Sequence, residues 1–261
     1  MRSALPLLLI PVLAAAVANS QSPNAILNIP RQAAEKADFR ATGHLVRVDP
    51  GGARTSYPIS LKAHYFPGVL RVLIEVSQPS GAASSGPHTA PVHVLLELHP
   101  GGQPTIKVAH PGDAAAAILP LDRWTEGVAG TGFTYEDFLE QQYFWAGQSV
   151  AEHVKYGARD TTLVKSTPGP SDRSGYSEVR TWLDSSIGFP VYVEKTMKKP
   201  APVREYTYFG LRHEGGVWSA NQIEEKNHGQ TGSTLLIIDR GSPKANLGPG
   251  DFSPEKLTRF P

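Results

Sequence analysis

Histidine is the residue type that most invites a chemical interpretation, because the chain has nine histidines and no cysteine. His93 and His99 lie on one face of a predicted strand, where the rise of an extended chain separates them by ~20 Å. That distance is too great for two ligands of one ion. Five others lie near predicted turns or loops: His88, His110, His153, His213 and His228. We therefore expect solvated histidines, no metal site and no cofactor.

Motifs of hydrolases and of nucleotide-binding proteins are incomplete in this chain. Gly147-Gln148-Ser149-Val150-Ala151 lacks the final glycine of a nucleophile elbow. Gly130-Thr131-Gly132 is not followed by the lysine of a P-loop. Serine, histidine and aspartate residues occur, but nothing in the sequence places them near one another. The sequence therefore predicts no enzyme, and a secreted hydrolase is the remotest alternative.

Two charged clusters could also do chemistry. Glu136 and Asp137 could act as paired acids. Adjacent residues on a helix point in different directions, however, and both acids would lie at the positive end of a predicted helix dipole. Lys195, Lys198 and Lys199 are typical of a solvated hairpin tip. Neither cluster is predicted to be catalytic.

The element that must position the two acids is a predicted helix over residues 134–146. Thr134 followed by Asp137 is a start similar to a capping box, and Gly147 is a plausible stop. The segment is either a helix that covers the open end of a sheet or a lid over an apolar pocket, and its spacing fits both. Six aromatic residues lie within thirteen positions in and just before this segment: Phe133, Tyr135, Phe138, Tyr143, Phe144 and Trp145.

Most of the remaining chain alternates between apolar and polar residues in the manner of half-buried strands, as in residues 69–76 and 92–99. Pro30 is predicted to start a short helix that includes residues 32–37, and residues 113–119 to form a helical turn. Because no helices alternate with the strands, the sheet should be antiparallel. The predicted strands are residues 42–48, 56–66, 69–76, 92–99, 105–109, 161–166, 176–184, 190–196, 203–211, 217–227 and 233–240.

The N-terminal residues 1–18 are predicted to be a cleaved signal peptide. Arg2 precedes an apolar run that ends in the small-x-small pattern Ala16-Val17-Ala18. The run is shorter than the ~20 residues that span a bilayer. Removal of the leader leaves 24 basic and 24 acidic residues, which argues against nucleic acid as a partner. The absence of cysteine excludes disulfides and a lipidated anchor cysteine. We expect a periplasmic, monomeric protein with one domain over residues 19–261.

Several stretches, in order, resemble the LolA-like outer-membrane lipoprotein-sorting proteins. Residues 130–138, Gly-Thr-Gly-Phe-Thr-Tyr-Glu-Asp-Phe, are similar to the family's Gly-Thr-Asp-Phe-Ser-Tyr-Glu-Asp-Leu. Residues 180–184 and 189–194 resemble its Trp-x-Asp strand and the Pro-led strand that follows. Residues 232–238 and 251–253 resemble its closing strand and terminal segment. Gly132 departs from the family's Asp, which puts in doubt any polar contact of that acid.

The resemblance implies a mainly β (α+β) fold, a single half-open antiparallel β-barrel of about ten or eleven strands with a few covering helices. It implies a periplasmic carrier of lipid or lipoprotein acyl chains, working between an inner-membrane release complex and an outer-membrane acceptor. It also favours the lid interpretation of residues 134–146. An envelope lipid-sensing or interaction module with the same fold is the alternative. Arg71 is a weak candidate for a gating residue, and the candidates for the cavity lining are Leu70, Val72, Ile74, Val94, Leu96, Phe133, Phe138, Trp145 and Trp182.

Overall fold

The structure is a computed structural model, and it describes residues 23–79, 91–99, 102–214 and 216–260. The predicted signal peptide, residues 1–18, lies outside the described residues. Within the described part, no helix is both long and apolar enough to cross a bilayer.

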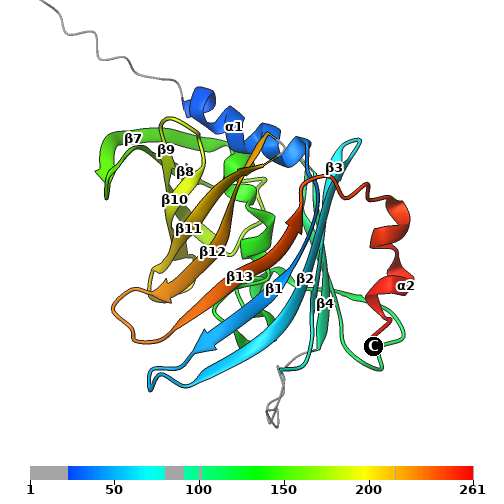
Figure 1. Ribbon diagram of the computed structural model, residues 1–261. Helices are drawn as coiled ribbons and strands as arrows, with labels where there is room; N and C mark the ends of the chain where they lie inside the picture. Colours follow the sequence, from blue (N-terminus) through cyan, green and yellow to red (C-terminus); the bar gives the residue numbers. More distant parts are fainter. Residues whose placement is uncertain (1–22, 80–90, 100–101, 215, 261) are drawn as a thin grey trace, which may run out of the picture.

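Thirteen strands form one antiparallel sheet that does not close, with β6 and β7 as its two edges (Figure 1). The order along the sheet is β6-β5-β4-β3-β2-β1-β13-β12-β11-β10-β9-β8-β7. The strands are β1 (Asp38–Val48), β2 (Arg54–Phe66), β3 (Val69–Val76), β4 (Val92–Leu98), β5 (Thr105–Ala109), β6 (Ala117–Ile118), β7 (Gly147–Tyr156), β8 (Arg159–Thr167), β9 (Tyr176–Asp184), β10 (Pro190–Met197), β11 (Arg204–Glu214), β12 (Val217–Asn227) and β13 (Ser233–Ser242).

The predicted strand number of ten or eleven was too low because the pattern of the two edge strands is weak. β6 has only two residues, both exposed, and lies where a helical turn was predicted. β7 has no fully buried side chain, and a bulge between Val150 and Glu152 shifts its register against β8. An edge strand with little burial and a broken alternation carries no clear period of two.

Residues 119–146, here called the strap, connect the two edge strands. The strap contains four short 3₁₀ helices, and the helix predicted over residues 134–146 is wrong. Glu140 adopts a left-handed backbone conformation, with φ of 45°, and separates two of these turns. Gly147 is the first residue of β7 and ends no helix. The four 3₁₀ helices are η1 (Leu121–Arg123), η2 (Val128–Gly130), η3 (Glu136–Leu139) and η4 (Gln141–Phe144).

Helix α1 (Pro23–Glu35) lies across one end of the sheet, above the strap (Figure 1). It begins well before Pro30, which lies inside it and does not start it as predicted. The reason is tertiary packing, because Ile26 and Leu27 are buried in a cluster with strap and sheet residues. That burial extends the helix upstream of the proline.

The strap covers one face of the sheet, here called the inner face, and the C-terminal segment covers part of the other, the outer face (Figure 1). On the inner face, strap residues such as Trp124 and Phe133 pack with side chains of the strands on both sides of the sheet centre. On the outer face, η5 (Pro249–Phe252) and α2 (Pro254–Leu257) pack on β3, β4 and β5. The two faces therefore have separate cores.

Candidate functional site

The apolar wall of the inner face is formed by β3 and β4. Their antiparallel register pairs Val72 with Leu96 and Ile74 with Val94, and places Leu70 opposite Leu98. All of these side chains are buried and belong to the main hydrophobic cluster. The alternation in the sequence therefore predicted correctly which residues share this face.

Phe133, Phe138 and Trp145 of the strap pack on the same cluster. The Phe133 ring lies 5.8 Å from the ring of Phe138 and 5.9 Å, edge on, from that of Tyr206. The structure thus brings eight of the nine predicted lining residues together. They come from both the sheet and its cover.

Two residues predicted for this site lie on the outer face. Trp182 packs edge on against Tyr192, with ring centroids 5.0 Å apart, because Val179 and Leu183 take the inward positions of β9. Arg71 alternates with the inward Val72, and its Nε donates to Glu97 Oε1 at 3.0 Å. Trp182 therefore does not line the inner face, and Arg71 does not reach a cavity there.

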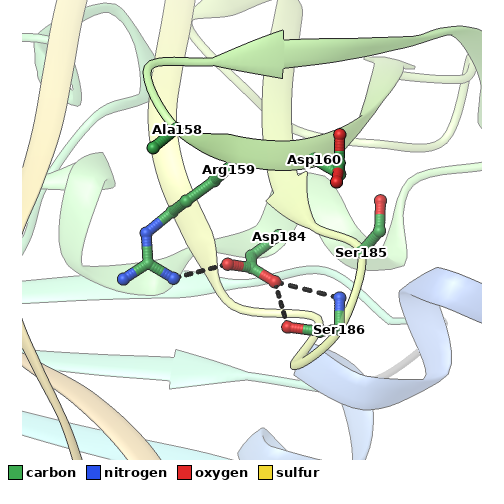
Figure 2. A pocket seen from close by; sticks show the side chains of 6 residues that line it. All are labelled: Ala158, Arg159, Asp160, Asp184, Ser185 and Ser186. Atoms are coloured by element: carbon green, nitrogen blue, oxygen red, sulfur yellow. Dashed lines mark hydrogen bonds and ion pairs between the residues drawn. The ribbon is translucent and has the colours of Figure 1, made fainter.

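The inner face is filled by the strap in this conformation. A hollow of about 10 Å³ is lined by Phe144 and Trp145 among others, which is room for a single water molecule. A larger hollow of about 470 Å³ lies at the ends of β8 and β9, away from the strap (Figure 2). Its lining is polar and includes Arg159, whose Nη1 lies 2.5 Å from Asp184 Oδ2 (Figure 2). Neither hollow is an apolar cavity for an acyl chain.

A buried polar cluster centred on Asp137 joins the strap to the sheet. Asp137 accepts hydrogen bonds from Lys195 Nζ at 2.9 Å and from the hydroxyls of Tyr176 and Tyr206, each at 2.7 Å. The Lys195 ammonium also lies 4.8 Å from the centre of the Tyr206 ring. Lys195 and Asp137 are separated by 58 positions in the chain, so only the fold brings them together.

The predictions for both members of this ion pair need correction. Lys195 is not at a solvated tip, since its side chain is only 6% exposed. It follows Val191 and Val193 on the inward face of β10, and that alternation was the signal in the sequence. Asp137 is more than a helix-dipole residue, although its predicted reciprocal bonds with Thr134 are confirmed: Thr134 N–H donates to Asp137 Oδ2 at 2.7 Å, and Asp137 N–H to Thr134 Oγ1 at 3.2 Å.

The two adjacent acids have different electrostatic environments. Burial alone would raise the pKa of Asp137, but the charges of Lys195 and Arg204 hold it below its usual value. Burial raises the pKa of Glu136, and hydrogen bonds from Ser174 and from the Gly175 N–H offset this only in part. Both acids are buried, so they anchor the strap and do not face a substrate.

A second polar anchor holds the start of residues 130–138, the stretch that resembles the LolA-like proteins. Arg204 Nη1 lies 2.9 Å from Glu225 Oε1 and also donates to the carbonyl oxygen of Gly132. The Gly132 N–H donates to Thr234 Oγ1 at 2.8 Å. A Cβ at Gly132 would lie 1.7 Å from Glu225 Oε2. The packing therefore explains why glycine stands where the LolA-like pattern has Asp.

The structure does bring one serine, histidine and aspartate together. His44 Nδ1 lies 3.2 Å from Ser56 Oγ, and His44 Nε2 lies 3.2 Å from Asp239 Oδ2. The three residues lie on β1, β2 and β13, whose neighbouring backbones pair within the sheet. Neither of the two hollows touches them. A catalytic triad also needs donors for an oxyanion and a site for the substrate.

Metal binding has no support in the described residues, where no three His, Asp or Glu side chains gather as ligands.

Comparison with known proteins gives a family and a fold. A family model described as "-like: Uncharacterized protein" matches residues 122–259, more than half of the chain. No curated protein shows significant sequence similarity to the chain.

Three solved structures share the fold, each over 91% of this chain and 100% of their own. One is a proposed outer membrane lipoprotein-sorting protein domain from Vibrio parahaemolyticus, with a TM-score of 0.76 and 19% identity. Another is a DUF1329 family protein from Desulfovibrio piger, with a TM-score of 0.74 and 13% identity. The third is a LolA superfamily protein from Nitrosomonas europaea, with a TM-score of 0.63 and 14% identity.

Proposed function

This chain belongs to the family of uncharacterised proteins whose model matches residues 122–259, and its fold is LolA-like; from this premise we propose that it is a periplasmic carrier of lipid or lipoprotein acyl chains. The chain binds them between the strap and the inner face of the sheet. It receives its cargo from an inner-membrane release complex and passes it to an outer-membrane acceptor. The carrier acts as a monomer, without a cofactor and without catalysis.

The observation that carries the proposal is the apolar wall of β3 and β4 beneath a separate cover. The strap buries the wall side chains. It is a separate segment from β3 and β4, and the chain enters and leaves it through the edge strands β6 and β7. Each methylene of an acyl chain that leaves water contributes ~0.8 kcal/mol. A chain that replaced strap side chains on this wall would therefore bind without any reactive group.

Binding requires the strap to move, because the hollow beside Trp145 is far below the ~300 Å³ of a small ligand pocket. The strap has a natural point of division at Glu140, whose left-handed conformation separates η3 from η4. The polar anchors at Gly132 and Asp137 lie before this point. Residues 141–146, which follow this point, are therefore the part of the cover that moves.

The experiment is to produce the full chain in a bacterial periplasm, purify it without detergent and identify bound lipid by mass spectrometry. We expect co-purified acyl lipid and its loss in Val72→Phe, because a larger side chain on the wall takes the space of the ligand. Val69→Phe is the matched control, since Val69 lies on the same strand and is only half-buried. Circular dichroism verifies that both variants fold. Wild-type protein that contains no lipid and binds none when lysophospholipid is added would refute the proposal.

A further inference from the structure

The paired strands β11 and β12 extend beyond their neighbours at one end of the sheet. They pair with each other from Arg204 and Asn227 to Glu214 and Val217. The strands on either side follow them for only four positions each, since β10 pairs with residues 204–207 and β13 with residues 222–225. Residues 208–214 and 217–221, here called the ribbon, therefore pair only with each other within the described sheet. A ribbon of two strands is marginally stable in water unless something packs against it.

One side of the ribbon is apolar and open. Tyr208 packs on the main hydrophobic cluster of the inner face, so the alternation of β11 directs Phe209, Leu211 and His213 to the outer side. The register places Trp218 opposite His213, and the centres of their rings lie 4.9 Å apart. The Phe209 side chain is 42% exposed. Large apolar side chains gathered on an open surface indicate a contact with another apolar phase or molecule.

The ribbon lies at the end of the sheet over which α1 runs (Figure 1). Because Gln222 of β12 pairs with Ile237 of the antiparallel β13, the first residues of β12 and the last residues of β13 lie toward the same end. Arg40, near the start of β1, pairs there with Ser242 of β13. These elements carry four of the five large apolar side chains that are exposed in the described structure: Ile29, Phe39, Phe209 and Val217.

Basic side chains accompany the apolar ones at this end. Five exposed lysine and arginine residues on or directly beside these elements have no ion-pair partner among the described residues: Lys36, Arg40, Arg212, Arg240 and Lys244. The exposed acids of the same elements are fewer: Glu35, Glu214 and Asp239. Asp239 Oδ2 also lies 3.2 Å from His44 Nε2. Positive charge is therefore concentrated at this end, although the whole chain has a net charge of only +1.

We propose that this end of the molecule docks on the surface of a bilayer that contains anionic phospholipids. The exposed apolar side chains enter the boundary between headgroups and acyl chains, and the unpaired cations bind the headgroup phosphates. A protein partner fits less well, because the centres of protein interfaces are depleted of charged residues and of lysine in particular. The inference goes beyond the proposed carrier function, since transfer of cargo between proteins needs no contact with lipid headgroups.

The test is co-flotation of the purified protein with phosphatidylcholine vesicles that contain or lack phosphatidylglycerol. We expect wild type to float with the anionic vesicles and to bind them more weakly in added salt, which screens the headgroup charge. Phe209→Ser should weaken this binding about tenfold, because a large apolar side chain no longer leaves water. Arg212→Gln should weaken binding to the anionic vesicles about fivefold and leave binding to the neutral vesicles unchanged.

Two matched substitutions lie away from the ribbon. Ile118→Ser removes an apolar side chain that is 68% exposed, from the edge strand β6. Arg54→Gln removes an exposed arginine at the opposite end of β2, where it pairs with the last residue of β1. Both should bind vesicles as wild type does, and thermal unfolding verifies that every variant folds.

The outcomes separate this docking surface from the carrier function. Wild-type protein that floats with neither kind of vesicle would refute the docking surface, and so would equal losses in the ribbon variants and in the two matched variants. The carrier function is decided independently by the lipid that co-purifies with the protein. Phe209→Ser should retain that lipid, because Phe209 is not part of the apolar wall of β3 and β4.

Discussion

Asp137 is the residue through which the strap and the sheet are joined most directly. It accepts hydrogen bonds from Lys195, Tyr176 and Tyr206, which lie on three successive strands, β9 to β11. Asp137 therefore anchors the strap to the sheet, a role that its position in the sequence motif alone does not reveal. The same Tyr-Glu-Asp stretch that carries the family resemblance is therefore also the attachment point of the cover.

Replacing Asp137 by Asn should lower the free energy of unfolding by about 3–5 kcal/mol, because the Lys195 ammonium loses its buried carboxylate partner. Urea unfolding followed by tryptophan fluorescence measures this. Asp160→Asn is the control, since Asp160 pairs with Lys155 at 3.4 Å with both side chains largely exposed, 78% and 73%. That change should stay within ~0.5 kcal/mol. Equal effects of the two substitutions would contradict the role of Asp137 as an anchor.

Glu225 makes stability depend on pH. Burial raises its pKa to about 7, outweighing the opposing charge of Arg204. A glutamate in the unfolded chain titrates near ~4.3, so between these values the folded state binds more protons than the unfolded state. The contribution is fully present below the unfolded pKa and is lost as pH rises through the folded pKa.

We therefore expect wild type to lose about 2–3 kcal/mol of unfolding free energy between about pH 5 and about pH 8 relative to Glu225→Gln. Urea titrations of both proteins across this range measure the difference, and taking the difference removes the contribution of other acids such as Glu136. A constant difference between the two proteins would show that Glu225 is ionised throughout.

At the scale of elements, the strap departs furthest from a regular structure. Its acids and aromatic residues bond and pack to strands, and Glu140 takes a left-handed conformation that a continuous helix does not permit. Alternation predicted eleven of the strands, and strands such as β1, β2 and β10 have one face that is more buried than the other. The strap has no comparable alternation in its sequence, because its side chains bond and pack largely to strands.

The left-handed conformation of Glu140 gives a prediction for this element. Glu140→Gly should keep or raise stability by up to ~1 kcal/mol, because glycine adopts positive φ without steric cost. Glu140→Val should lower it by ~1–3 kcal/mol, since a β-branched residue is strained there. Both variants lose the weak bond from the Tyr208 hydroxyl, at 3.4 Å, so the comparison isolates the backbone. Thermal unfolding measures the order, and a valine variant as stable as the glycine variant would contradict it.

At the scale of the whole molecule, an open sheet has two faces to bury, and different segments cover them. The strap covers the inner face, and the C-terminal segment covers Leu73 and Leu95 on the outer face. The outer core is small, so its stability depends on few side chains. His93 adds a polar tie, because its Nδ1 lies 3.0 Å from the carbonyl oxygen of Leu257.

Leu257→Ala should lower the free energy of unfolding by about 2–4 kcal/mol, because the side chain is 1% exposed and its removal leaves a cavity over β3 and β4. Lys256→Ala in the same short helix is the control and should cost less than ~1 kcal/mol, since its partner Asp251 pairs with it at the surface. Urea unfolding measures both. If Leu257→Ala unfolded like wild type, the C-terminal segment would not be part of the folded core.

The sequence by itself determined the features that depend on near neighbours in the chain. The alternation of Leu70, Val72 and Ile74 predicted the wall, and the spacing of Thr134 and Asp137 predicted their reciprocal hydrogen bonds. Trp182 was predicted for the wrong face although its neighbours Val179 and Leu183 gave the correct alternation.

Only the tertiary structure decided the burial of Lys195, the left-handed turn at Glu140 and the packing of α1 over Tyr143. Each depends on residues far apart in the sequence, such as the 58 positions between Asp137 and Lys195. A buried charge is stable only where an opposite charge lies beside it. For Lys195 and Asp137, that proximity depends on how the strap packs against β10. Local pattern therefore specifies the wall, whereas long-range pairing specifies what covers and anchors it.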